Sequence, residues 1–308
     1  MMQPKLAEKI KKQTRKEFPD GIPAFGTDAI RFTFAALASF GRDIKFDLKR
    51  VEGYRNFCNK LWNASRFVLI NLESKSINIS AELSSQDQWI LSRLQQTKIE
   101  VEKHLADYRL DLMSQTLYDF VWHDYCDWYL EFSKPLLDNS ITKQGCEATL
   151  LKVLSETLVL LHPIIPFITE EIFEQSQKLH SGSNEKLITK AFPEPEKDLF
   201  NADAESEVDW LKEFVLGIRK IRGEMNIPPG KPLPCFIKNY NSKDKNYIKN
   251  NKSIIFALAK LDNIKLLKGD EEEPESAIAL VGEMKILIPL AGLIDKDAEK
   301  DRLNKEID

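Results

Sequence analysis

The sequence predicts a mainly helical protein, in which a helical bundle is followed by a small α+β domain. Apolar residues recur at helical spacing through most of the first 180 positions. Two loop-like stretches, SGSNEK (181–186) and FPEPEKD (192–198), then mark a change in composition, and short β-like runs follow them. A chain of 308 residues is long enough to build two hydrophobic cores.

The first half is predicted to form long helices joined by short links, which is the pattern of a bundle. We expect helices at about 27–39, 47–70, 86–104, 111–133, 143–161 and 163–179, after a basic amphipathic segment at 4–18. Thr27 or Asp28 is expected to cap the first, and Ser84 or Ser85 the third. Pro135 is expected to close the fourth, and Pro163 to lie in the first turn of the last.

The second half mixes helix and strand patterns. A helix is expected at about 204–224 and another near 244–260, with strands at 234–238, 264–268, 278–281 and 284–289. Gly282 and Glu283 separate the last two strands and favour a tight type II′ hairpin. These elements define the predicted α+β domain.

Composition excludes several classes of function. Hydrophobic residues make up 43% and charged residues 30% of the chain, and no apolar run approaches the length of a membrane span. The basic N-terminus lacks the apolar centre of a secretory signal. The four cysteines form no CxxC pair, so reduced, buried thiols in the cytoplasm are expected and a zinc site is not. A net charge of −4 means that any nucleic-acid site must be a local patch.

One aromatic residue stands on the polar side of the helix at 47–70. At about 100° per residue, a broad apolar arc collects Val51, Tyr54, Cys58, Leu61, Trp62, Ser65, Val68 and Leu69. The opposite stripe collects Lys49, Asn56, Lys60, Asn63 and Phe67, and Arg66 can reach its edge. This combination suits single-stranded RNA, because an aromatic ring stacks on a base while cations hold phosphates and amides read base edges. The alternative is that Phe67 packs under a neighbouring helix or loop.

Several motifs follow one another in a fixed order. They are GTDAIRF (26–32), GRDIKFD (41–47), RNFCNKLWNASRF (55–67), YCDWYLE (125–131), HPIIPFITEEIF (162–173) and EMNIPPGKPL (224–233). Together they closely resemble the C-terminal part of bacterial valyl-tRNA synthetases, over essentially the whole chain. The resemblance implies a bundle of the class Ia anticodon-binding type.

The resemblance also implies site residues. Positions matching Lys49, Lys60, Arg66 and Phe67 grip the anticodon loop in that family, with the aromatic ring stacked on a base. Those matching Leu130 and Glu131 also face the anticodon, and a carboxylate can accept from a base amino group. Arg31, in the DAIR stretch, is a possible contact to the tRNA stem. Lys49 departs from the Arg of some relatives, which keeps the charge but removes the bidentate fork.

For the whole enzyme, the resemblance implies attachment of valine to tRNA(Val) with ATP and magnesium, in the cytoplasm, by a monomer. Neither the HIGH-type nor the KMSKS-type motif of the catalytic domain occurs here. We therefore expect a fragment that is inactive alone, with no catalytic residue, metal or cofactor of its own. Its expected parts are a connecting helix and loop (1–25), the anticodon-binding bundle (26–182), the α+β domain (198–295) and the start of a coiled-coil arm (296–308).

Other readings stay open. The chain could be the same module from an isoleucyl- or leucyl-type synthetase, or a helical protein-interaction scaffold without an RNA role. Arg219, Arg222 and Lys231 form either a second basic surface or a structural element at the domain junction. His123 and Asp124 are adjacent on a helix and therefore do not face each other, so a catalytic acid–base pair is not expected.

Overall fold

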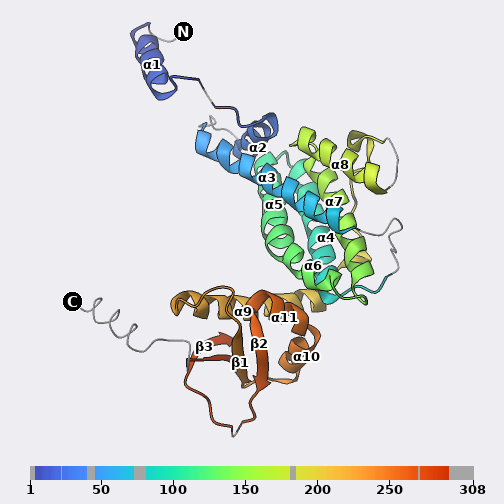
Figure 1. Cartoon of the computed structure of the whole chain (residues 1–308). Coiled ribbons are helices and arrows are strands. Elements are labelled where there is room, and N and C mark those ends of the chain that lie inside the picture. Colours follow the sequence, from blue (N-terminus) through green and yellow to red (C-terminus); the bar gives the residue numbers. More distant parts are fainter. Residues whose placement is uncertain are drawn as a thin grey trace, which may run out of the picture.

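The computed structural model describes residues 4–21, 23–39, 46–72, 81–180, 185–269 and 271–290. In this part of the chain a helical bundle is followed by a four-stranded sheet with its own helices, which we call the α+β unit (Figure 1). The predicted fold class is confirmed. The predicted start of a coiled-coil arm at 296–308 lies outside the described residues.

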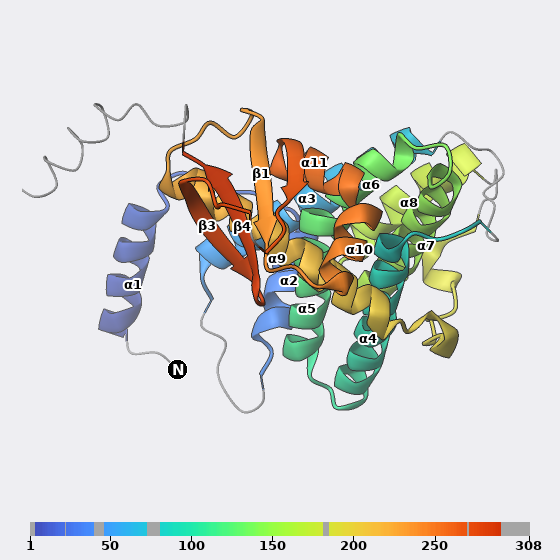
Figure 2. The same ribbon diagram turned by 90° about the horizontal axis from the view of Figure 1, so that it is seen from below.

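The bundle is built from helices that bury one face each. Their bounds are α2 (Thr27–Leu37), α3 (Leu48–Asn71), α4 (Ser85–Ala106), α5 (Leu110–Asp119), the π-helix η1 (Phe120–Tyr129), α6 (Leu130–Leu137), α7 (Lys143–Leu161) and α8 (Pro166–His180). The basic helix α1 (Pro4–Glu17) stands apart from them in Figure 1 and Figure 2. Its apolar residues Leu6 and Ile10 are accordingly exposed.

Side-chain caps begin two of the long bundle helices. Ser84 caps α4 in a capping box with Asp87, as one of the two predicted caps. Asp47 caps α3 by accepting from the Lys49 backbone N–H at 2.9 Å. The N-cap of α2, however, is Gly26 without a side-chain bond, so the prediction of Thr27 or Asp28 was wrong. Asp28 is instead turned toward α8.

Both proline predictions need correction. Pro135 lies inside α6, which continues to Leu137 because Leu136 is still buried in the bundle core. The last bundle helix begins at Pro166 rather than Pro163. A turn follows α7 there, and His162 Nδ1 lies 2.9 Å from the Thr169 hydroxyl, which bridges the turn to the new helix.

The sheet has the strand order β2-β1-β4-β3. Its strands are β1 (Leu233–Lys238), β2 (Leu261–Leu266), β3 (Ser276–Val281) and β4 (Met284–Pro289). Strand β1 pairs parallel with β2 and antiparallel with β4, which also pairs antiparallel with β3. A parallel neighbour requires a crossover, and the chain makes it with helices. Gly282 has a φ of 56°, the positive value that the first residue of a type II′ hairpin turn requires.

The crossover is two helices, α10 (Ser242–Asn250) and α11 (Lys252–Ala259), where one helix at 244–260 was predicted. The break falls at Asn251, which is 1% exposed. Its side chain accepts from Gln86 Nε2 at 2.5 Å and donates to Glu207 Oε1 at 2.7 Å. This residue therefore connects the α+β unit to α4, a long-range requirement that helical periodicity does not reveal.

Helix α9 (Ala202–Glu224) lies between the sheet and the bundle (Figure 1). It packs on α4 on one side and on β3 and β4 on the other. A Cβ at Gly217 would lie 3.0 Å from the Ala279 Cβ, so a glycine allows the close approach of helix and strand. The helix thus joins the two cores.

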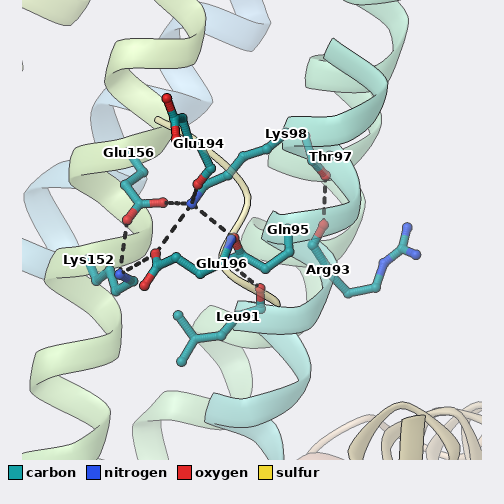
Figure 3. A network of polar contacts seen from close by, with 9 residues as sticks. All are labelled: Leu91, Arg93, Gln95, Thr97, Lys98, Lys152, Glu156, Glu194 and Glu196. Atoms are coloured by element: carbon teal, nitrogen blue, oxygen red, sulfur yellow. Dashed lines mark hydrogen bonds and ion pairs between the residues drawn. The ribbon is translucent and has the colours of Figure 1, made fainter. Parts of the chain in front are cut away.

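The proline-rich linker before α9 is held against the bundle, with short 3-10 turns η2 (Leu187–Thr189) and η3 (Lys197–Leu199). Lys98 of α4 is 1% exposed, and its ammonium donates to the Glu194 carbonyl at 3.1 Å (Figure 3). It also lies 2.6 Å from Glu156 and 3.5 Å from Glu196. A buried ammonium needs such partners, so this network fixes the path of the linker.

Candidate nucleic-acid interface

The face that α3 turns into the bundle determines which residues can meet RNA. Its buried residues are Val51, Phe57, Cys58, Leu61, Ala64, Ser65 and Val68. This arc is rotated by roughly 30° from the predicted one, at about 100° per residue. Phe57 is fully buried and contacts Phe32 and Tyr118, whereas Trp62, predicted in the core, is 40% exposed.

Phe67 consequently lies at the border of the core. It is partly buried and packs against the core cluster, so the prediction that it lies opposite the core was wrong. Phe57 and Ala64 are buried, although the predicted arc did not include them. The buried face of α3 therefore lies closer to the predicted polar stripe, which contains Phe67. An aromatic ring held on one side by the core has a fixed orientation, which is useful for stacking. Its contact with a base stays a prediction.

Lys60 is already paired within the protein. Its ammonium lies 2.5 Å from Asp127 Oδ1 and 4.0 Å from the centroid of the Trp122 ring. Neither Asp127 nor Trp122 was predicted to lie on this surface. RNA phosphate would have to compete with Asp127 for Lys60 or bind the ammonium beside it.

The π-helix η1 explains how Trp122 and Asp127 meet one lysine. They are five residues apart, which in an α-helix would place them about 140° from each other. In a π-helix the hydrogen bonds run from residue i to i+5, and the Leu130 N–H indeed bonds the Tyr125 carbonyl. Residues five apart then share a face. The predicted helix at 111–133 therefore comprises nearly all of α5, all of η1 and the first half of α6.

His123 and Asp124 point to different partners. His123 is exposed and lies between Asp119 and Asp127, at 3.9 and 3.5 Å. Asp124 accepts from Arg93 Nε at 3.0 Å and lies 3.7 Å from Lys212 of α9. The two residues therefore form no acid–base pair.

Leu130 and Glu131 differ in their exposure to solvent. Leu130 is 7% exposed and belongs to the core cluster, which leaves it little area for an RNA contact. Glu131 is partly exposed, and its carboxylate accepts from the Lys134 ammonium at 2.6 Å. Phe57 pairs with Tyr118, and Lys60 with Asp127, so α3 and the helix through η1 run in the same direction. The roles of Leu130 and Glu131 in RNA binding stay predictions.

The other candidate residues of α3 are exposed: Lys49, Asn56, Asn63 and Arg66. Arg66 also lines a groove between α3 and α8 with a volume of about 620 Å³. Trp62 lines the same groove, beside Ile70, Ile172 and Leu179. The exposed aromatic residue of α3 is thus Trp62, which was predicted in the core. It lies one helical turn from Arg66.

Arg31 has a structural partner. Its Nε donates to the Ile164 carbonyl at 2.9 Å and its Nη2 to the Pro163 carbonyl at 3.0 Å. Asp28 accepts from the Ile168 backbone N–H at 2.7 Å, at the positive end of the α8 dipole. The DAIR stretch therefore clamps α2 onto the start of α8. The possible stem contact of Arg31 stays a prediction.

Arg222 is inside the protein rather than on a basic surface. It is 7% exposed, and its guanidinium donates to the carbonyls of Pro228, Lys231, Ala259 and Lys260 at 2.8–3.2 Å. Burial lowers the pKa of this group below its ordinary value. Arg222 fixes the loop after α9 against the end of α11.

Other site classes find no support in the described part of the chain. All four cysteines are free and buried, as predicted, and burial raises the pKa of Cys58 to about 12. Among the residues that the structure describes, no group of histidine, cysteine or acidic side chains could hold a metal ion. The helices described here also include none with the length and apolarity to cross a membrane.

Comparison with protein families defines the class. Residues 87–237 match the family described as "Anticodon-binding domain of tRNA ligase". The match covers α4 to α9 and the first strand of the sheet. The chain thus carries an anticodon-binding domain of the tRNA ligases.

Individual relatives are more specific. The chain is 49% identical over 307 residues to valine--tRNA ligase of Legionella pneumophila, in the strains Lens, Paris and Philadelphia 1. Each alignment covers 97% of this chain and 33% of the relative. The chain is homologous to the C-terminal portion of valine--tRNA ligases and spans about a third of the length of the curated relatives it matches.

A solved structure shows a weaker likeness. It is named "Crystal structure of the ternary complex of Agrobacterium radiobacter K84 agnB2 LeuRS-tRNA-LeuAMS". It shares 17% identity, with a TM-score of 0.43, over 58% of this chain and 21% of that one. A TM-score this low supports no inference about the fold.

Proposed function

We propose that the chain recognises the anticodon of tRNA(Val), as part of a longer protein that attaches valine to this tRNA. The observation that carries the proposal is the 49% identity to valine--tRNA ligase, which extends over 97% of the chain. The match to an anticodon-binding domain points to the same role.

The proposed contact surface is the outer side of α3 together with the start of α6. Lys49 and Arg66 are exposed cations on α3, and Asn56 and Asn63 are exposed amides between them. In this proposal the cations bind phosphates, and the amides bind base edges. Phe67 stacks on one base, with its other face supported by the core.

The end of the bundle supplies the remaining contacts. Glu131 accepts from a base amino group once it has exchanged its contact with Lys134. Leu130 supports Glu131 from the core and touches the base only with its exposed edge. Arg31 reaches the stem with the part of its guanidinium that the Pro163 and Ile164 carbonyls leave exposed.

The proposed affinity is local and salt-dependent. The net charge is −4, so the chain as a whole does not attract RNA. The proposed cationic contacts are Lys49, Lys60 and Arg66, and each neutralised phosphate contributes roughly −0.7 to −0.9 to the slope of log K against log salt. Three such contacts give an expected slope of about −2 to −3.

A binding assay tests the proposal. The chain is titrated into labelled tRNA(Val) transcript, and into the same transcript with its anticodon replaced, over a series of salt concentrations. We expect tighter binding to the native anticodon, and weaker binding for Lys49→Ala combined with Arg66→Ala. Equal affinity for both transcripts contradicts anticodon recognition. Tighter binding to isoleucine or leucine tRNA would assign the chain to the related synthetases instead.

ATP with magnesium belongs, in this proposal, to the rest of the longer protein, which acts as a monomer in the cytoplasm. We assign no catalytic residue to this chain. The purified chain is expected to give no valine-dependent ATP–pyrophosphate exchange, and measurable exchange would contradict the assignment.

A further inference from the structure

A second pocket with a cationic rim lies on the α+β unit. It is about 430 Å³ in volume and lies where the end of α9 meets the end of α11. Its lining comprises Arg219, Arg222, Gly223, Ile227, Pro229, Leu258 and Lys260. Pockets of 300–1,000 Å³ are of the size that takes small organic groups. Apolar side chains form most of this one, and its charged groups are all cations.

The charge in this pocket is not compensated by acids. Arg222 is buried with carbonyl partners alone, so its positive charge is solvated by dipoles. Arg219 and Lys260 are exposed at the rim. Among the residues that the structure describes, none of the three has a carboxylate within 4.0 Å, whereas the neighbouring Lys220 pairs with Glu224 at 3.8 Å. A buried cation beside two exposed ones makes the pocket attractive to an anion.

The apolar wall fits a planar group. Ile227 is buried, Leu258 is partly buried, and Pro229 is exposed beside them. A nucleotide combines a flat base with a phosphate, and so matches an apolar wall with a cationic rim. An inorganic anion would use only the rim.

The pocket is connected to the candidate interface through Trp128. The guanidinium of Arg219 lies 5.7 Å from the Trp128 ring centroid. Trp128 directly follows Asp127, the partner of Lys60, and precedes Glu131 by three residues. Helix α11 packs on α6, as Figure 1 shows. Glu131 is the second residue of α6. An RNA strand that leaves the bundle along η1 therefore meets Arg219 next.

We propose that this pocket between α9 and α11 binds one nucleotide of the same RNA, next to the anticodon contacts, with its phosphate between Arg219 and Lys260 and its base against Ile227, Pro229 and Leu258. The inference rests on the proposed function for the identity of the RNA. It adds a second contact on the α+β unit, so that bundle and sheet hold one ligand.

The test removes the two rim charges. Arg219→Gln is combined with Lys260→Asn, because Lys260 has a φ of 51° and Asn tolerates this conformation. The control removes two exposed lysines from α10, which does not line the pocket, as Lys245→Gln with Lys249→Asn. Affinity for tRNA(Val) transcript is measured by fluorescence anisotropy over a salt series, and circular dichroism checks that each variant is folded.

We expect the pocket pair to weaken binding by about tenfold and to reduce the salt slope by about one, because the two cations hold one phosphate. The control pair should leave both quantities close to the original. An equal effect of the two pairs would show a response to net charge alone and would overturn the inference. An unchanged affinity of the pocket pair would overturn it as well.

A second measurement uses the unmodified chain. A transcript that contains 4-thiouridine is cross-linked to the protein, and the attached peptides are identified by mass spectrometry. Attachment within 223–231 or 253–260 is expected, and attachment confined to the bundle contradicts the pocket. If the chain binds no tRNA, the proposed function fails. A six-nucleotide oligouridylate that contains 4-thiouridine then replaces the transcript. Cross-linking of this oligonucleotide to the same peptides would support the pocket proposal alone. If no cross-link forms, both proposals are refuted.

Discussion

Replacing Phe67 by alanine tests whether one ring serves both packing and recognition. The matched variant is Phe57→Ala on the same helix. Phe57 is fully buried between Phe32 and Tyr118, so its loss should lower the free energy of unfolding by about 3–5 kcal/mol. Phe67 is only partly buried, and its loss should cost about 1–2 kcal/mol. Urea denaturation followed by circular dichroism measures both.

Binding should show the opposite order. One base–aromatic stack contributes about 1–3 kcal/mol, so Phe67→Ala should weaken tRNA binding by roughly 5- to 150-fold. Phe57→Ala should bind normally under conditions where it remains folded, because its ring has no exposed face. Anisotropy with tRNA(Val) transcript measures the affinities. If Phe67→Ala destabilises the fold as much as Phe57→Ala and leaves binding intact, Phe67 is a core residue and the stacking argument is refuted.

Three further predictions concern buried and paired groups. Asp127→Asn should release Lys60 and strengthen tRNA binding severalfold at low salt. The free energy of unfolding should change by less than about 1 kcal/mol, since the ion pair is partly exposed. Weaker binding would instead show that Asp127 positions the lysine for RNA. Arg222→Met should lower the free energy of unfolding by about 3–5 kcal/mol, because four carbonyls lose a charged donor, and an effect below 1 kcal/mol by urea denaturation would contradict this. The thiols should react with Ellman's reagent only on unfolding. Burial raises the pKa of Cys58 from 9.0 to about 12, so the folded chain keeps a proton that the unfolded chain releases. This contribution to stability is complete below pH 9.0 and is lost as the pH rises toward 12, which urea midpoints at alkaline pH can measure.

Local chemistry was readable where neighbours in the sequence are also partners. The capping box at Ser84, the positive φ at Gly282 and the bounds of β4 follow from adjacent residues. The division into bundle and α+β unit follows from the change of periodicity near residue 181. Ordered motifs along the whole chain identified the family, and the match to valine--tRNA ligases confirms it.

The candidate site was predicted only in outline. A helical projection gives the angle between side chains but not the direction of the core, which depends on the helices that pack around α3. Trp62, predicted in the core, is consequently exposed, and Phe57, which the predicted arc did not include, is buried. The π-helix is also invisible to a periodicity of 3.6 residues, so the pairing of Lys60 with Asp127 could not be foreseen.

The sequence by itself determined the fold class, the family and the helix that carries the polar stripe, because these depend on composition, periodicity and motif order. The tertiary structure alone decided which candidate side chains are exposed and unpaired. Lys60 is paired, Phe67 is supported by the core, and Arg222 is enclosed by carbonyls. The physical reason is that exposure and charge pairing arise between segments far apart in the chain, as between α3 and η1 or α9 and α11.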